Sequence, residues 1–120
     1  MIAAPASSGF SIRRAESSPT VPCPCGQSTR IVSAVDGLGC SFHITEIRDS
    51  VRHYHQKTAE LYYILDGSGK MELNGDWFDI DVGDVITIAA GTRHRLVSEQ
   101  GVRTIVVGVP AFDPADEFFD

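Results

Sequence analysis

The sequence has little positive charge, few cysteines and no long apolar run, and each shortage excludes a class of function. Its 120 residues include 10 Lys and Arg against 16 Asp and Glu, for a net charge of −6. No basic stripe can neutralise phosphates, so no nucleic acid is expected as a partner. No segment approaches the ~20 apolar residues that span a bilayer, so no membrane partner is expected either.

The N-terminus and the cysteines indicate the compartment. The first residues lack the basic and apolar regions of a signal peptide, and a cytoplasmic location is predicted. Cys23-Pro24-Cys25 has the wrong spacing for a zinc knuckle or a redox pair. We therefore predict that Cys23, Cys25 and Cys40 are reduced thiols without a metal role; the alternative is that Cys25 or Cys40 contacts a ligand.

What the sequence does contain is the composition of one folded domain, with 42% hydrophobic residues. Residues 1–28 are rich in Ala, Ser and Pro and are predicted to form a flexible N-terminal arm or one short added strand. Residues 29–110 are predicted to form a β-barrel domain. Residues 111–120 are predicted to form a short C-terminal tail, helix or coil, in which Asp113 caps a helix that starts at Pro114.

The central domain is typical of an all-β fold. Residues 40–47 alternate, with Ser41, His43 and Thr45 on one face, and further strands are predicted over residues 30–35, 51–55, 60–65, 85–89, 93–97 and 102–109. Asn74-Gly75 predicts a tight hairpin between residues 70–73 and 76–80. About eight or nine short strands at such spacing favour an antiparallel sandwich or barrel. A jelly roll fits best, because it can enclose a pocket.

Four potential metal ligands lie on three of these strands. His53 and His55 point to the same face because side chains alternate with period two, Glu60 opens the next strand, and His94 lies on a later one. Three imidazoles and one carboxylate suit one divalent transition metal (Fe, Mn, Ni, Zn, Co or Cu) better than Ca or Mg. Metal affinity should fall as the pH drops through the histidine range near ~6.5. The alternative is a hydrogen-bonded polar cluster without metal.

The same alternation predicts the wall of a pocket. Tyr62 and Ile64 share a strand face with the glutamate, and Leu96 shares one with the last histidine. Tyr62 is predicted as the catalytic residue, which donates or orients a proton. His43 is a further pocket candidate, with a solvated or simply hydrogen-bonded role as its alternative.

These residues resemble the two motifs of the cupin superfamily, in particular its small single-domain (type-2) members. The first motif, G-x5-H-x-H-x3-4-E-x6-G, is matched by His53, His55, Glu60 and Gly67, with Ile47 at the leading glycine. The second motif, G-x5-P-x-G-x2-H-x3-N, is matched by Gly83, Gly91 and His94, with Ala89 and Ser98 at the proline and asparagine positions.

The resemblance implies a jelly-roll barrel, a metal held by His53, His55, Glu60 and His94, a small-molecule ligand or substrate, and a homodimer. Because all four ligands are retained, the first expectation is a metal-dependent, dioxygenase-like enzyme that acts on a small organic molecule. Two alternatives stay open, since one fold hosts many functions. They are a non-catalytic binding protein for a sugar or organic acid, and a cupin-type isomerase or epimerase.

Overall fold

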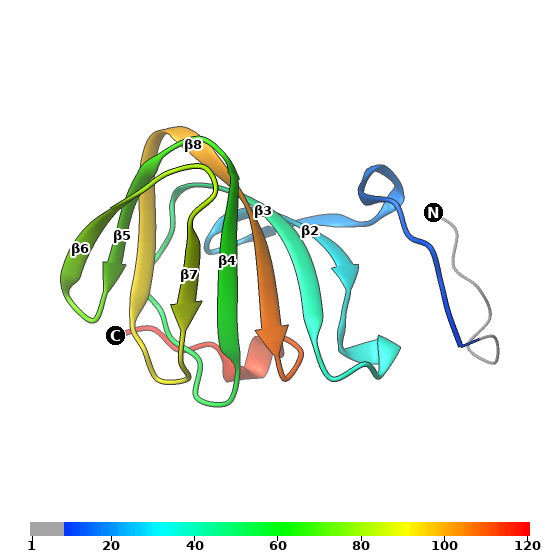
Figure 1. Ribbon diagram of the computed structural model, residues 1–120. Helices are drawn as coiled ribbons and strands as arrows, with labels where there is room; N and C mark the ends of the chain where they lie inside the picture. The colour runs from blue at the N-terminus through cyan, green and yellow to red at the C-terminus, as the bar shows by residue number, and fades with distance from the viewer. Residues whose placement is uncertain (1–8) are drawn as a thin grey trace.

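The computed structural model describes residues 9–120, and their regular secondary structure is mostly antiparallel β-strands (Figure 1). The strands are β1 (Thr20–Cys23), β2 (Gly26–Val32), β3 (Ser41–Asp49), β4 (Ala59–Asp66), β5 (Gly69–Leu73), β6 (Asp76–Ile80), β7 (Val85–Ile88) and β8 (His94–Val109). Short 3-10 helices are η2 (Ala15–Ser17), η3 (Ala34–Asp36) and η4 (Pro114–Asp116). Among residues 9–120, no helix has the length and apolarity that crossing a membrane requires.

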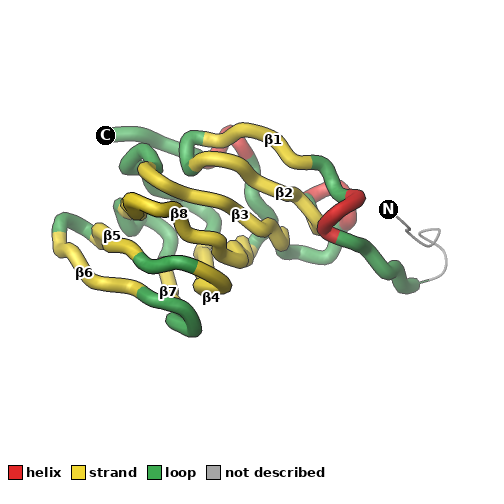
Figure 2. The backbone as a smooth tube through the Cα atoms, turned by 90° about the horizontal axis from the view of Figure 1, so that it is seen from above, coloured by secondary structure: helices red, strands yellow, loops and turns green. Residues whose placement is uncertain are grey.

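The long strand β8 joins the two sides of the barrel. Its first part, residues 94–97, pairs with β5, and its second part, residues 102–109, lies between β3 and β4. The sheet runs in the order β1-β2-β3-β8-β4-β7, and the β5–β6 hairpin joins it through the pairing of β5 with the first part of β8 (Figures 1 and 2). The predicted all-β barrel is confirmed. The strands predicted separately over residues 93–97 and 102–109 form one continuous strand, β8, which passes through Gly101 with φ of +96°.

Two turns depend on backbone conformations that the sequence anticipates. The predicted hairpin at Asn74-Gly75 is confirmed: φ is +51° and +94° at these residues, as a type I′ turn requires. At Gly67 φ is +86°, and a Cβ there would collide with the carbonyl oxygen of Gly101. The motif glycine after β4 therefore allows two backbone segments to approach closely.

The N-terminal part of the described chain is more ordered than an arm. Residues 20–28 form β1 and the beginning of β2; β1 pairs with β2, and β2 pairs with β3. Residues 1–8 of the predicted arm fall outside the described residues. Cys23 and Cys25 form a disulfide at the end of this hairpin, so the prediction of reduced thiols is wrong for them, and only Cys40 is free. The strand predicted over residues 30–35 ends at Val32, because Ser33 and Asp36 form a capping box for η3.

The barrel interior contains the hydrophobic core. The buried apolar residues form one cluster: Ile47, Tyr62, Ile64, Met71, Ile80, Ile86, Ile88, Leu96, Val102 and Val106. The inner face of β3 carries Ser41, His43 and Thr45, all of which are buried; the alternation in the sequence did not indicate which face points inward. The interior therefore has a polar part as well as an apolar one.

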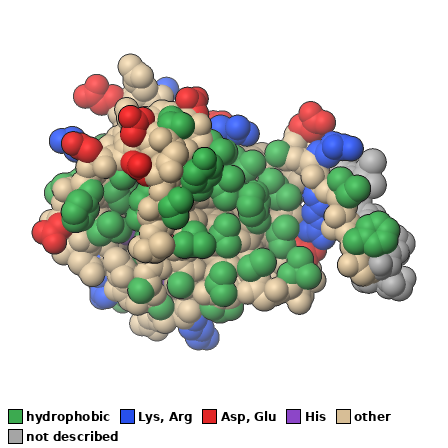
Figure 3. All heavy atoms as spheres, viewed as in Figure 1, with side chains coloured by type: hydrophobic (Ala, Val, Ile, Leu, Met, Phe, Trp, Pro, Cys, Tyr) green, Lys and Arg blue, Asp and Glu red, His purple; other side chains and the backbone are tan. Residues whose placement is uncertain are grey.

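Exposed apolar side chains gather on the outer face of β4, β7 and the end of β8 (Figure 3). They include Leu61, Tyr63, Val85 and Val109, whose exposed fractions are 42%, 43%, 60% and 51%. Contiguous exposed apolar surface of this kind commonly marks a contact with another protein.

Candidate metal centre

The two histidines of the His-x-His pair lie on an irregular segment. The strand predicted over residues 51–55 is wrong, because this segment makes only two isolated bridges, from His53 to His94 and from Tyr54 to Phe118. The backbone N–H of His53 donates to the carbonyl of His94 at 3.1 Å, and the N–H of His94 donates to the carbonyl of His53 at 2.9 Å. These two hydrogen bonds hold both segments side by side, so the histidine side chains meet.

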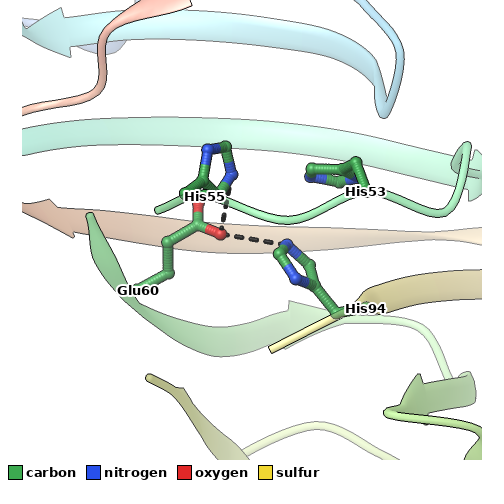
Figure 4. Close-up of side chains that lie close together, drawn as sticks. All are labelled: His53, His55, Glu60 and His94. Atoms are coloured by element: carbon green, nitrogen blue, oxygen red, sulfur yellow. Dashed lines mark ion pairs between the residues drawn. The ribbon is translucent and has the colours of Figure 1, made fainter. Parts of the chain in front are cut away.

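All four predicted ligands converge inside the barrel (Figure 4). Glu60 enters from β4, and its strand neighbours are Ile88 of β7 and Gly108 of β8. One possible ligand atom of each of the four residues lies within 4.8 Å of those of the others. All four side chains are buried.

Each imidazole is oriented through its Nδ1 atom. Nδ1 lies 2.7 Å from the carbonyl of Val51 for His53, 2.7 Å from the carbonyl of Asp116 for His55, and 2.9 Å from the carbonyl of Thr92 for His94. A carbonyl only accepts hydrogen bonds, so Nδ1 carries the hydrogen and Nε2 of each neutral ring presents a lone pair. This backbone support is typical of metal-binding histidines.

At the centre of the cluster, one carboxylate oxygen lies close to two imidazole nitrogens. Oε1 of Glu60 lies 3.3 Å from Nε2 of His55 and 3.0 Å from Nε2 of His94 (Figure 4). These atoms are within ion-pair range, yet Oε1 of Glu60 and Nε2 of His94 are buried without a properly oriented hydrogen bond. Lone pairs on neutral rings repel a carboxylate oxygen unless a cation lies between them. A divalent transition metal with nitrogen and oxygen ligands fits this arrangement.

Burial and the neighbouring groups shift the pKa values of the cluster residues. Burial raises the pKa of Glu60, but interactions with His55 and His94 outweigh it and lower the pKa to about 2. Burial lowers the pKa of His55, whereas Glu60, the carbonyl of Asp116 and Glu117 raise it and prevail. Burial and the neighbouring His94 lower the pKa of His53 to about 4. In the metal-free cluster, Glu60 is ionised, and His55 takes up a proton more readily than His53.

Tyr62 lies beside the cluster on the inner face of β4. Its side chain is buried, and its ring meets that of His94 edge-on, with centroids 6.2 Å apart. Burial, together with the charges of Glu60 and Glu117, raises the pKa of Tyr62 well above its usual value. The phenol is therefore neutral and is available as a proton donor.

The other predicted pocket residues divide into two groups. Ile64 and Leu96 are fully buried within the hydrophobic core. His43 is buried on β3, where its ring meets that of Phe112 edge-on at 5.9 Å. Burial and the charge of Arg30 lower the pKa of His43 to about 4, so the ring is neutral. The structure places all three inside the barrel, and their contact with a ligand stays a prediction.

The C-terminal segment folds back over the cluster, which the sequence analysis missed. In Figure 1 this segment runs beneath the ends of the barrel strands. Phe112 meets the ring of His55 edge-on at 5.9 Å, and Phe119 lies 6.3 Å from the ring of His53. The N-cap at Asp113 and the helix from Pro114 are confirmed by η4, but no spacing in the sequence shows where this turn packs.

Two acidic residues of this segment support the site. The carboxylate of Asp116 accepts the backbone N–H groups of residues 56–58 at 2.9 to 3.2 Å, which fixes the loop between His55 and β4. Glu117 is half-buried. Burial and the charge of Glu60 raise the pKa of Glu117, whereas His55 lowers it. Glu117 is thus a carboxyl group that can exchange a proton beside the cluster.

Two hollows of the described surface lie elsewhere. One lies beside the Cys23–Cys25 disulfide and the other beside the β5–β6 hairpin, and neither includes a cluster residue. The cluster is therefore covered by the C-terminal segment rather than open to a wide cleft.

Comparison with known proteins agrees with this fold. The cupin domain family model matches residues 42–108. An L-ectoine synthase of Mycobacteroides abscessus is 33% identical over 87 residues, which cover 69% of this chain and 67% of that protein. An L-ectoine synthase of Halomonas elongata is 31% identical over 109 residues, which cover 78% and 80%. A crystal structure of a protein from Planctomyces limnophilus has a TM-score of 0.84 and 33% identity, and covers 90% of this chain and 95% of its own.

Proposed function

The chain belongs to the cupin family, and we propose that it is a metal-dependent enzyme that acts on a small organic molecule. The observation that carries the proposal is the buried convergence of one carboxylate with three imidazoles whose Nδ1 atoms are held by backbone carbonyls, because this leaves the Nε2 atoms to bind a cation. The ligands would be His53, His55, Glu60 and His94. A divalent transition metal bound there would act as a Lewis acid and polarise an oxygen or nitrogen of the substrate.

The reaction we propose is non-oxidative. The ligand set alone led to the expectation of dioxygenase-like chemistry, but the curated relatives described above are named L-ectoine synthases. We therefore favour bond formation or elimination at a polarised substrate group. Such chemistry needs proton transfer at neutral pH and needs no oxygen.

Two residues are suited to transfer the protons. Tyr62 keeps its proton in its buried position and would donate it to the substrate. Glu117 of the C-terminal segment has a raised pKa and would accept a proton. A pair of groups whose pKa values are shifted in a shared site is typical of acid–base catalysis. The same pair would serve an isomerase or epimerase.

The test is turnover with and without oxygen. The metal-free protein is loaded with Fe(II), Mn(II), Co(II) or Zn(II) and is given small organic substrates, beginning with that of the L-ectoine synthases. We expect product formation that is equal in air and under anaerobic conditions and that falls by about 10²-fold or more in Tyr62→Phe. Oxygen-dependent turnover would restore the dioxygenase reading. Ligand-dependent thermal stabilisation without any product would favour the binding protein.

We also propose that the chain forms a homodimer through the outer face of β4, β7 and β8. The support is the exposed apolar surface that includes Leu61, Tyr63 and Val85. Light scattering after size exclusion should give twice the monomer mass for the wild type and the monomer mass for Leu61→Lys/Val85→Lys. A wild-type monomer at micromolar concentration would contradict this proposal.

A further inference from the structure

Two buried polar atoms on the inner face of β2 have no hydrogen-bond partner: Oγ of Ser28 and Nε of Arg30. Ser28 is only 2% exposed. Leaving a buried donor without a partner costs roughly 1–3 kcal/mol, and more for a charged group. Two such donors, two residues apart on one strand, point to a polar group that is not part of the protein.

The strand register places these donors on the same side of the sheet as the metal cluster. Arg30 is paired with His43 of β3, which is paired with Val106 of β8, which is paired with Tyr62 of β4. Directly paired residues of antiparallel strands share a face. His43, Val106 and Tyr62 are all buried, so this row faces the barrel interior. Arg30 therefore lies in the same row as Tyr62, next to the row that contains Glu60.

The guanidinium of Arg30 is held in place but is not neutralised. Its Cζ atom lies 5.2 Å from the centre of the Phe112 ring, which itself contacts His43 and His55. No carboxylate of residues 9–120 forms an ion pair with it, whereas the guanidinium of Arg13 makes two hydrogen bonds to the carboxylate of Asp36. Stacking on an aromatic face leaves the planar fork of an arginine free to bind an anion.

The charges around Arg30 also favour an anionic ligand. The positive charge of Arg30 lowers the pKa of His43 on β3 and that of Glu117 in the C-terminal segment. The neutral His43 leaves the negative charge of Glu60 and the half-buried Glu117 as the opposing groups. A divalent metal bound at the cluster would carry more charge than the single negative charge of Glu60. Arg30 and the metal would then be two positively charged groups at the same site as the neutral His43 and Tyr62.

We propose that Arg30 and Ser28 form a subsite that binds a carboxylate of the substrate. Arg30 would hold the carboxylate through its planar fork, and the Ser28 hydroxyl would donate a further hydrogen bond. The substrate is thus a small carboxylic acid whose second polar group, at the other end of the molecule, meets the metal. This assignment rests on the proposed function, because it names the substrate class of the same site.

The subsite is tested by the preference for an acid over its uncharged amide. Calorimetry measures binding of two- to six-carbon dicarboxylic, α-hydroxy and α-amino acids, each beside its primary amide, to zinc-loaded and to metal-free protein. We expect at least one acid to bind about 10- to 100-fold more tightly than its amide, as for a charged hydrogen bond. Equal binding of every pair, or no binding by any acid, would overturn the proposal.

Variants assign the preference to this residue. Arg30→Gln should abolish the preference, and Arg30→Lys should keep part of it, because the charge remains but the fork is lost. Arg103→Gln is the matched control, since Arg103 is exposed and its nearest carboxylate, that of Glu46, is 4.0 Å away. It should bind acids as the wild type does. A preference that survives in Arg30→Gln would overturn the subsite.

Metal content separates this proposal from the one on which it rests. Arg30→Gln should bind the same amount of zinc as the wild type, because Arg30 is not a ligand. If the wild type binds no metal but still prefers acids through Arg30, the metal-dependent function fails and the subsite stands. If metal and turnover are present but Arg30→Gln keeps the acid preference, the function stands and the subsite fails.

Discussion

The interior of the barrel has a polar part and an apolar part, and three strands cross from one to the other. On β4 the inner face runs from Glu60 through Tyr62 to Ile64, and on β8 it runs from His94 to Leu96. On β3 the buried face likewise ends at Ile47, after three polar residues. Ile47, Ile64 and Leu96 all belong to one hydrophobic cluster.

The two parts differ in how well their groups are satisfied. The apolar part is filled by side chains that are almost fully buried and need no partners, so it stabilises the fold. The polar part buries a carboxylate, several imidazoles, a serine and one nitrogen of an arginine, and several of these groups have no hydrogen-bond partner. Unsatisfied buried groups cost stability, so the polar part is explained by what it binds.

The largest expected contrast separates two residues that are neighbours on one strand face. Leu96→Ala should lower the free energy of unfolding by about 2–5 kcal/mol, because it leaves a cavity in the core. His94→Ala should change the stability of the metal-free protein by less than about 2 kcal/mol, because it also removes an unsatisfied buried nitrogen. Denaturant unfolding of both metal-free variants measures the difference.

Metal binding should show the reverse order. His94→Ala should weaken metal binding by about 10²-fold or more, and Leu96→Ala should keep it wherever the variant is folded. Equal loss of stability in the two variants, or equal loss of metal, would mean that the two parts of the interior are not separate.

A smaller effect is expected at the C-terminal support of the site. Asp116→Ala removes the acceptor of three backbone N–H groups and frees the loop after His55. Metal affinity should fall by about 10-fold, as is usual when a residue behind a ligand is lost. Competition with a chelator of known affinity measures it. Asp113→Ala, which removes only the cap of η4, is the control and should have a weaker effect.

The last contrast concerns the pH dependence of the metal-free protein. The folded-state pKa values of His43 and His53 are lowered to about 4, so the unfolded chain binds more protons and stability rises with pH from about 4 to 6.5. The pKa of His55 is raised, so its contribution is present below about 6.5 and is lost as the pH rises through the raised value.

Stability of the metal-free protein should therefore be highest near pH 6.5. Metal affinity should instead continue to rise above that pH, because the metal displaces the proton. Unfolding curves at a series of pH values, with and without zinc, test this pair of trends. Parallel pH profiles with and without zinc would speak against histidine ligation.

The ligand set was predictable because it depends on local rules. Period two places alternate residues of a strand on one face, and Tyr62 and Ile64 share the buried face of β4 with Glu60, as this rule predicts. His53, His55 and Glu60 also converge as their spacing predicts, although the segment of the two histidines makes isolated bridges and is not a strand. Asn74-Gly75 was predictable because few residues adopt positive φ at both turn positions.

The rest depends on contacts between distant parts of the chain. Arg30 is assigned to the interior only by its register with His43, which the sequence of β2 does not reveal. Asp116 and Glu117 reach the site because Phe118, in the same C-terminal segment, forms a β-bridge with Tyr54, which lies far away in the sequence. The disulfide between Cys23 and Cys25 forms at a hairpin that was predicted as an arm. None of these contacts leaves a periodic pattern.

The most direct test of the central claim is X-ray absorption of the protein after loading with zinc or cobalt and removal of the excess. We predict one metal ion per chain, with three imidazole nitrogens and a carboxylate oxygen as protein ligands, and either a weaker imidazole signal or loss of the metal in His94→Ala and His55→Ala. A wild-type protein that retains no metal, or a metal bound without imidazole, would contradict it.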